Sequence, residues 1–195
     1  MKNRVLLAAL VGAPAALLIS PACAGQTFEI DGGHTHVMFK FERFGLSYVI
    51  GGFTDVAGEL TLDKDAPENS SVNATVQIAS FSSGNPNRDA HAVGPRWLNA
   101  EQSPAMTFTS TSVELTGEET AIVTGDLTLH GVTRPLSLDV ALHNFGNDPS
   151  TKREAAGFSA TGSLNRQDFG ITTAQGFISD EVEITIEVLA IAAEE

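Results

Sequence analysis

Cysteine is almost absent from this chain. Its 195 residues include one cysteine, Cys23, which lies in an N-terminal stretch that we expect to be removed. A mature chain without cysteine has neither disulfides nor thiolate metal ligands. We therefore expect packing and sheet hydrogen bonds to provide its stability, even if the protein is exported to a compartment that permits disulfides.

Positive charge is also scarce. The 11 Lys and Arg residues face 24 Asp and Glu residues, which gives a formal net charge of −13 at pH 7. Such a charge repels phosphate backbones, so the composition argues against nucleic acid as a partner. It is typical of a protein with a solvated acidic surface.

The only long apolar run is at the N-terminus. Lys2 and Arg4 precede apolar residues 5–19, and Ala22, Cys23 and Ala24 fit a small-residue cleavage site. The run is shorter than the roughly 20 residues that a membrane-spanning helix needs. We predict a signal peptide over residues 1–24 with cleavage after Ala24, and one domain over residues 25–195. Lipidation of Cys23 is the alternative and stays open.

Alternation of apolar and polar residues dominates the rest of the chain. The clearest stretch, residues 123–140, alternates on both sides of His130 and Gly131, as two antiparallel strands joined by a turn would. Strands with one dry face and one wet face belong to antiparallel sheets. The pattern predicts an all-β sandwich or closed barrel, and one Trp, one Tyr and polar outward faces argue against stable membrane insertion. The eight segments that alternate are residues 37–41, 56–62, 72–78, 106–108, 123–129, 136–142, 158–164 and 182–190.

Small residues share the dry faces with large aliphatic ones. Gly58, Ala74, Gly125, Ala160 and Gly162 have the inward parity of their strands. Small inward residues either leave an eight-stranded barrel hollow for a ligand or fit its taper by alternating with large ones. If the interior is hollow, we expect Gly125→Leu or Gly162→Leu to block uptake of the ligand while the fold stays largely intact.

Helical pattern is limited to residues 88–93, with a single turn expected over residues 44–47. The long connection over residues 82–105 contains three prolines and the only tryptophan, Trp97. Long connections in compact domains are often lids or binding loops. Trp97 and Leu98 could equally plug one end of the core.

Sequence motifs of enzymes are missing as well. There is no nucleophile elbow, phosphate-binding loop or dinucleotide fingerprint. His34 and His36 share one strand face, but a zinc or copper site needs a third ligand, and the other histidines lie on distant segments. We expect no enzyme activity, no metal and no cofactor. A metal-dependent redox factor that uses His34 and His36 is the alternative.

Several blocks, in order, resemble the YceI-like family of bacterial periplasmic proteins. They are IDGGHTHVMF at residues 30–39, GLSYVIGGF at 45–53, RDAH at 88–91, WLNAE at 97–101, PAMTF at 104–108, the hairpin at 123–140, and GFSA at 157–160 through NRQDFG at 165–170. The resemblance implies a lipocalin-like, eight-stranded antiparallel barrel with one or two short helices and a periplasmic location. It also implies that the interior holds a polyisoprenoid chain. The chain departs from the family pattern at Arg43, where histidine is usual, and at Ala92, where leucine is usual.

The resulting hypothesis is a non-enzymatic carrier that holds an isoprenoid quinone or polyprenyl phosphate inside the barrel. We predict a polar mouth that contains Arg43, Arg88 and Arg134. A homodimer stays open, and a stress-response protein with a filled core is a second alternative to the carrier. The predicted lining consists of Phe39, Phe41, Gly58, Val76, Trp97, Phe108, Gly125, Leu127, Leu138, Phe158, Gly162 and Ile186.

Overall fold

The computed structural model describes residues 25–194. The predicted signal peptide and Cys23 lie outside the described residues. Cleavage after Ala24 therefore stays a prediction, and lipidation of Cys23 stays its alternative. None of the helices in residues 25–194 is long and apolar enough to cross a bilayer.

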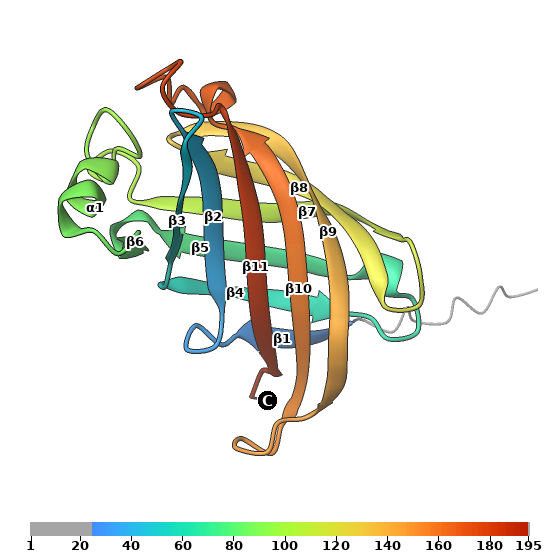
Figure 1. The fold of residues 1–195 in the computed structure, drawn as a ribbon. Helices are drawn as coiled ribbons and strands as arrows, with labels where there is room; N and C mark the ends of the chain where they lie inside the picture. The colour runs from blue at the N-terminus through green and yellow to red at the C-terminus, as the bar shows by residue number, and fades with distance from the viewer. Residues whose placement is uncertain (1–24, 195) are drawn as a thin grey trace, which may run out of the picture.

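The described chain forms a closed barrel of antiparallel strands (Figure 1). Each strand of a ring pairs with the next, and the last strand, β11, pairs back onto β1. The predicted all-β, eight-stranded antiparallel barrel is confirmed. In ring order the strands are β1 (Gln26–Ile30), β4 (Val56–Leu62), β5 (Ser71–Gln77), β7 (Ala105–Leu115), β8 (Thr120–Leu129), β9 (Val132–Asn147), β10 (Glu154–Asn165) and β11 (Glu181–Ala192).

Three further strands extend the sheet from β11: β2 (His36–Arg43), β3 (Ser47–Phe53) and β6 (Phe81–Ser82). Strand β11 pairs with β1 near its C-terminal end and with β2 over its N-terminal half. The eight predicted segments include β2 but miss β1, β3 and the two-residue β6. Strand β1 is only five residues long, and β3 has exposed Tyr48 and Ile50 followed by two glycines, so neither alternates cleanly.

The predicted short helix is present as α1 (Pro86–Ala92), which begins two residues earlier than expected. Asn85 caps it by accepting a hydrogen bond from the Arg88 amide at 3.1 Å, and proline occupies the first turn, where no backbone donor is needed. The predicted turn joins β2 to β3. Single 3₁₀ turns occur at η1 (Pro67–Asn69), η2 (Ile78–Ser80) and η3 (Arg166–Phe169).

The hydrophobic interior falls into two packed groups. Phe28, Leu60, Ala190 and Ala192 form the smaller group where β1 closes the ring. The larger group includes Phe39 and Phe53, whose ring centroids lie 6.0 Å apart. Many inward side chains between these groups are only half-buried, and the reason is a cavity that they face.

Candidate ligand cavity

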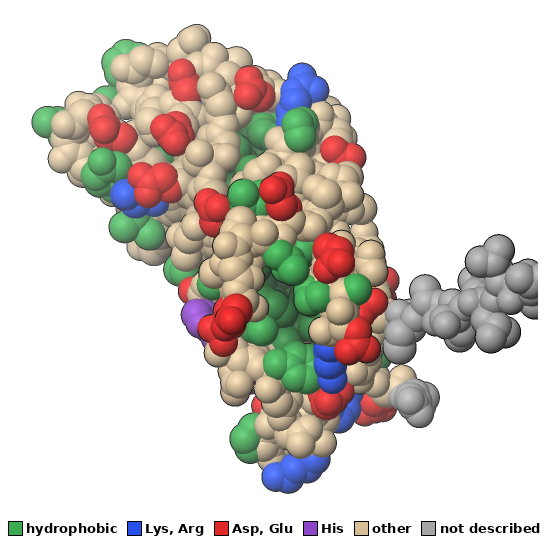
Figure 2. Space-filling model, turned by 90° about the vertical axis from the view of Figure 1, so that its right-hand side faces the viewer, with side chains coloured by type: hydrophobic (Ala, Val, Ile, Leu, Met, Phe, Trp, Pro, Cys, Tyr) green, Lys and Arg blue, Asp and Glu red, His purple; other side chains and the backbone are tan. Residues whose placement is uncertain are grey.

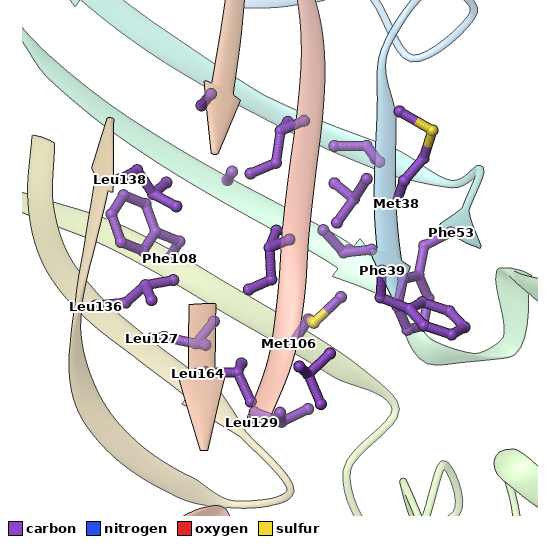
Figure 3. Close-up of a pocket in the computed structure, with 18 of the residues that line it drawn as sticks. Met38, Phe39, Phe53, Met106, Phe108, Leu127, Leu129, Leu136, Leu138 and Leu164 are labelled. Carbon is purple, nitrogen blue, oxygen red and sulfur yellow. The ribbon is translucent and has the colours of Figure 1, made fainter. Parts of the chain in front are cut away.

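A cavity of about 1500 Å³ lies inside the barrel. Figure 3 shows Phe108, Leu136 and Leu138 on one side of it and Phe39 and Phe53 on the other. The volume exceeds the roughly 300–1,000 Å³ of ordinary small-molecule pockets, and voids larger than a water molecule are rare in packed interiors. The structure therefore does not favour the alternative of a filled core.

Strand parity identified many of the strand residues in the cavity wall. Alternate residues of a strand project to the same face, so the inward residues of neighbouring strands converge on one space. Nine of the twelve predicted lining residues face the cavity. They are Phe39, Phe41, Val76, Trp97, Phe108, Leu127, Leu138, Phe158 and Ile186.

The structure does not place the three predicted glycines, Gly58, Gly125 and Gly162, among the residues that line the cavity. A Cβ at Gly125 would lie 2.5 Å from both the Phe108 ring and the Thr109 carbonyl. At Gly162 it would lie 2.9 Å from the Leu138 side chain, and at Gly58 2.1 Å from a backbone oxygen. These glycines make room for neighbouring side chains and backbone, whereas Ala74 and Ala160 do line the cavity.

Exposed arginines lie where the cavity reaches one end of the barrel, which we name the arginine end. Arg43, Arg88 and Arg96 all line the cavity there. The Arg88 guanidinium is fixed by Ser83, whose hydroxyl and carbonyl accept hydrogen bonds of 2.6 and 2.7 Å. The Arg43 guanidinium lies 4.0 Å from the centroid of the Phe44 ring. Two of the predicted mouth residues are thus at this end, together with Arg96, which the sequence interpretation missed.

Arg134, the third predicted mouth residue, is not among the lining residues. It is exposed, and its Nη1 donates to the Thr133 carbonyl at 2.9 Å. The turn of its hairpin is held against η3, because the His130 imidazole hydrogen bonds to the Phe169 carbonyl at 3.0 Å. Because this contact holds the turn of the hairpin against η3, the adjoining part of β9 keeps Arg134 on the outside of the barrel.

The long connection between β6 and β7 helps to close the arginine end. Trp97 and Leu98 line the cavity and also pack against the buried core, so the segment combines the expected features of a lid and a plug. The Thr173 hydroxyl donates a hydrogen bond to the Arg96 carbonyl and joins this connection to the loop after η3.

That second loop is organised by Arg166, whose side chain is almost completely buried. Its guanidinium donates to the carbonyls of Ile171, Thr173 and Ser179 at 2.6, 2.9 and 3.0 Å. It also donates to the Asp180 carboxylate at 2.7 Å. Because the loop supplies Thr173 and Phe177 to the cavity wall, Arg166 shapes the arginine end while four of its five N–H donors are occupied.

The other end of the cavity, which we name the acidic end, has the opposite charge. Its lining includes Asp63, Glu118 and Glu119, together with Lys64, whose ammonium is 3.0 Å from Glu154. Figure 2 shows a hollow on this side of the molecule, lined by hydrophobic side chains and surrounded by acidic ones. The charged residues at the two ends therefore give the cavity a polarity that strand alternation does not predict.

The two histidines of the His-x-His motif do not converge on a third ligand. Within residues 25–194 no group of three His, Cys, Asp or Glu residues is arranged to hold a metal ion. The His34 imidazole instead lies 2.8 Å from the Asp31 carboxylate. This hydrogen bond, with a second one from the Gly33 amide, lowers the pKa of Asp31.

Comparison with known proteins adds independent observations. The family model described as "YceI-like domain" matches residues 28–190. A "UPF0312 protein" of Serratia proteamaculans is 38% identical over 183 residues, which cover 93% of this chain and 94% of the relative. BcnA of Burkholderia cenocepacia superposes with a TM-score of 0.74 at 21% identity, over 82% of this chain and 98% of BcnA. A polyisoprenoid binding domain from Saccharophagus degradans superposes with a TM-score of 0.65 at 12% identity, over 86% and 99% of the two chains.

Proposed function

The chain belongs to the YceI-like family, and we propose that it is a non-enzymatic binding protein that carries an isoprenoid lipid inside its barrel. The cavity of about 1500 Å³ is the observation that carries this proposal. The fold shared with the polyisoprenoid binding domain of Saccharophagus degradans supports it.

The size and lining of the cavity suit a long hydrocarbon chain. An apolar protein cavity of about 150 Å³ holds one benzene molecule, which has six carbon atoms. On that scale, a cavity of about 1500 Å³ has room for a chain of roughly 60 carbon atoms. Aliphatic and aromatic side chains bind such a chain without directional contacts, so we expect weak selectivity for chain length.

Burial of the chain provides enough free energy for binding. Each methylene group removed from water contributes about 0.8 kcal/mol. Association costs about 4–15 kcal/mol before any net affinity appears. A few isoprene units therefore suffice for micromolar binding, and no cofactor beyond the lipid is required.

Charge favours one orientation of the ligand. Guanidinium groups donate hydrogen bonds to phosphate oxygens and to quinone carbonyls. Arg43, Arg88 and Arg96 offer such groups at the arginine end, whereas Asp63, Glu118 and Glu119 repel an anionic group at the acidic end. We place the headgroup of a quinone or polyprenyl phosphate at the arginine end, with its tail directed towards the acidic end.

The proposed site of action is the periplasm. The expected signal peptide over residues 1–24 supports export. An isoprenoid tail is too apolar to cross an aqueous compartment unprotected, so a barrel that encloses it would serve as a carrier or reservoir.

Two neighbouring residues provide the test. Ala160 lines the cavity, whereas Thr161 is exposed on the outer face of the same strand. Ala160→Phe should add a ring inside the cavity and weaken ubiquinone binding at least about tenfold, the loss that corresponds to about 1.4 kcal/mol. Thr161→Phe adds the same ring on the outer face of the barrel, so this variant should bind ubiquinone as tightly as the unmodified protein. Titration with ubiquinone, followed by fluorescence of Trp97, measures both.

Thermal unfolding of both variants serves as the control for folding. Equal ubiquinone affinity in folded Ala160→Phe and Thr161→Phe proteins would mean that the lipid does not occupy the cavity. Absence of ubiquinone and polyprenol binding by the unmodified protein would refute the proposal itself.

A further inference from the structure

An exposed apolar patch lies at the arginine end. We name Phe44, Leu46 and Phe177 the tip patch; their side chains are 48%, 85% and 61% exposed. Figure 1 shows the β2–β3 turn beside the loop after η3, and these two segments supply the three residues. The Phe44 amide donates to the Phe177 carbonyl at 2.8 Å, and their ring centroids are 5.9 Å apart in an edge-to-face arrangement.

The turn that presents Phe44 is unusual for its sequence. Phe44 and Gly45 have φ values of +57° and +64°, so the two central residues are both left-handed. Hairpin turns of this kind favour Asn-Gly, and a bulky residue in the left-handed region is an outlier. The chain therefore keeps an exposed aromatic ring where a small polar residue would be easier to accommodate, which points to a role for the ring.

The tip patch is continuous with the cavity. Phe44 and Phe177 are exposed to solvent and also line the cavity, and Arg43, whose guanidinium lies over the Phe44 ring, lines it as well. Segments that lie in a membrane surface combine exposed Phe and Leu side chains with nearby Lys or Arg, and the tip patch beside Arg43 has this combination.

We propose that the tip patch docks on the surface of a lipid bilayer, so that the isoprenoid lipid passes directly between the bilayer and the arginine end. This inference rests on the proposed lipid-binding function. The patch is small for a protein partner, because a stable interface buries about 800 Å² on each side and one aromatic side chain contributes about 150–250 Å² at most.

The net charge of −13 argues against docking through electrostatic attraction to anionic lipids. Insertion of a few apolar side chains instead depends on apolar area, so zwitterionic lipid should suffice and added salt should matter little.

Leu46 and Ile50 provide matched variants. Leu46 is in the tip patch and does not line the cavity. Ile50 is 61% exposed on the outer face of β3, pairs with Lys40 and also does not line the cavity. Leu46→Asp should reduce docking, whereas Ile50→Asp should not.

The first measurement is flotation with phosphatidylcholine vesicles that contain no quinone, which tests docking separately from lipid binding. The second is the rate at which ubiquinone in such vesicles quenches the fluorescence of Trp97, the only tryptophan and a cavity residue. We expect Leu46→Asp to lose flotation and to slow ubiquinone transfer about tenfold, the factor expected for a loss of about 1.4 kcal/mol. Equilibrium quenching by ubiquinone added from ethanol should be unchanged in Leu46→Asp.

Equal flotation and equal transfer rates for Leu46→Asp and the unmodified protein would overturn the docking proposal. A dimeric unmodified protein that becomes monomeric in Leu46→Asp would also overturn it, because the patch would then bind a second copy. If ubiquinone from ethanol fails to quench Trp97, the proposed function fails, and flotation still decides whether the tip patch docks.

Discussion

Removal of the Arg166 guanidinium should destabilise the protein far more than removal of an exposed cation. Arg166 is 4% exposed and donates to three backbone carbonyls and to the Asp180 carboxylate. Arg166→Leu deletes these donors and leaves buried acceptors without partners. The loop that carries Thr173 and Phe177 loses its anchor at the same time.

The expected loss of unfolding free energy follows from the burial of the Arg166 guanidinium. Breaking a buried ion pair by removing one partner costs about 3–5 kcal/mol, because the remaining groups keep their desolvation cost. Asp180 is partly exposed, so the lower part of this range is expected. For a chain of this length, 1 kcal/mol shifts Tm by about 2–4 °C, so Arg166→Leu should lower Tm by about 6–12 °C.

Urea denaturation and calorimetry measure the effect. Lys64→Met is the control, because the Lys64–Glu154 pair is exposed and such pairs contribute about 0–1 kcal/mol. The unfolding free energy should fall by at least about 3 kcal/mol in Arg166→Leu and hardly change in Lys64→Met. A loss below about 1 kcal/mol in Arg166→Leu would refute the argument that this network organises the arginine end.

Two further predictions concern glycine packing and acid stability. Gly125→Ala should lower the unfolding free energy by about 1–3 kcal/mol, because its Cβ would lie 2.5 Å from a ring and from a backbone carbonyl. Gly157→Ala, whose Cβ finds its nearest neighbour at 4.0 Å, should be close to neutral by urea denaturation. The lowered pKa of Asp31 means that its bond to His34 stabilises the fold above pH 3.8 and that this contribution is lost as pH falls further. Acid titration of Asp31→Asn should lack this loss, which is below about 1 kcal/mol because the His34 side chain is 73% exposed.

Alternation was sufficient to predict an antiparallel sandwich or barrel and many of the strand residues that line the cavity, whereas the resemblance to the YceI-like family favoured the barrel. In β10, residues 158, 160, 162 and 164 have inward parity, and the period of two assigns each to its face without knowledge of the partner strands. The same rule could not find β3, where the outer face carries Tyr48 and Ile50 and no polar–apolar contrast remains.

The role of individual small residues depended on contacts between strands. Gly125 and Ala160 have the same inward parity, yet Phe108 fills the space at Gly125 while Ala160 borders the cavity. Which of these occurs depends on cross-strand register, and register is not encoded in one strand alone.

The arginines predicted for the mouth show the same limit of sequence periodicity, which does not tell which of them line the cavity. Arg96 lies in an irregular connection and Arg134 in a regular strand, but Arg96 lines the cavity and Arg134 does not. Loop positions follow from tertiary contacts such as the bond between Thr173 and the Arg96 carbonyl, for which the sequence carries no periodic signal.

The most direct test of a lipid-filled barrel is native mass spectrometry of protein purified from its own host without detergent. We expect the folded protein to carry one additional mass in the range of an isoprenoid quinone or polyprenyl phosphate, and Ala160→Phe to lose most of it. A folded protein found only at its polypeptide mass, which also fails to gain mass when ubiquinone or polyprenol is added, would contradict the account.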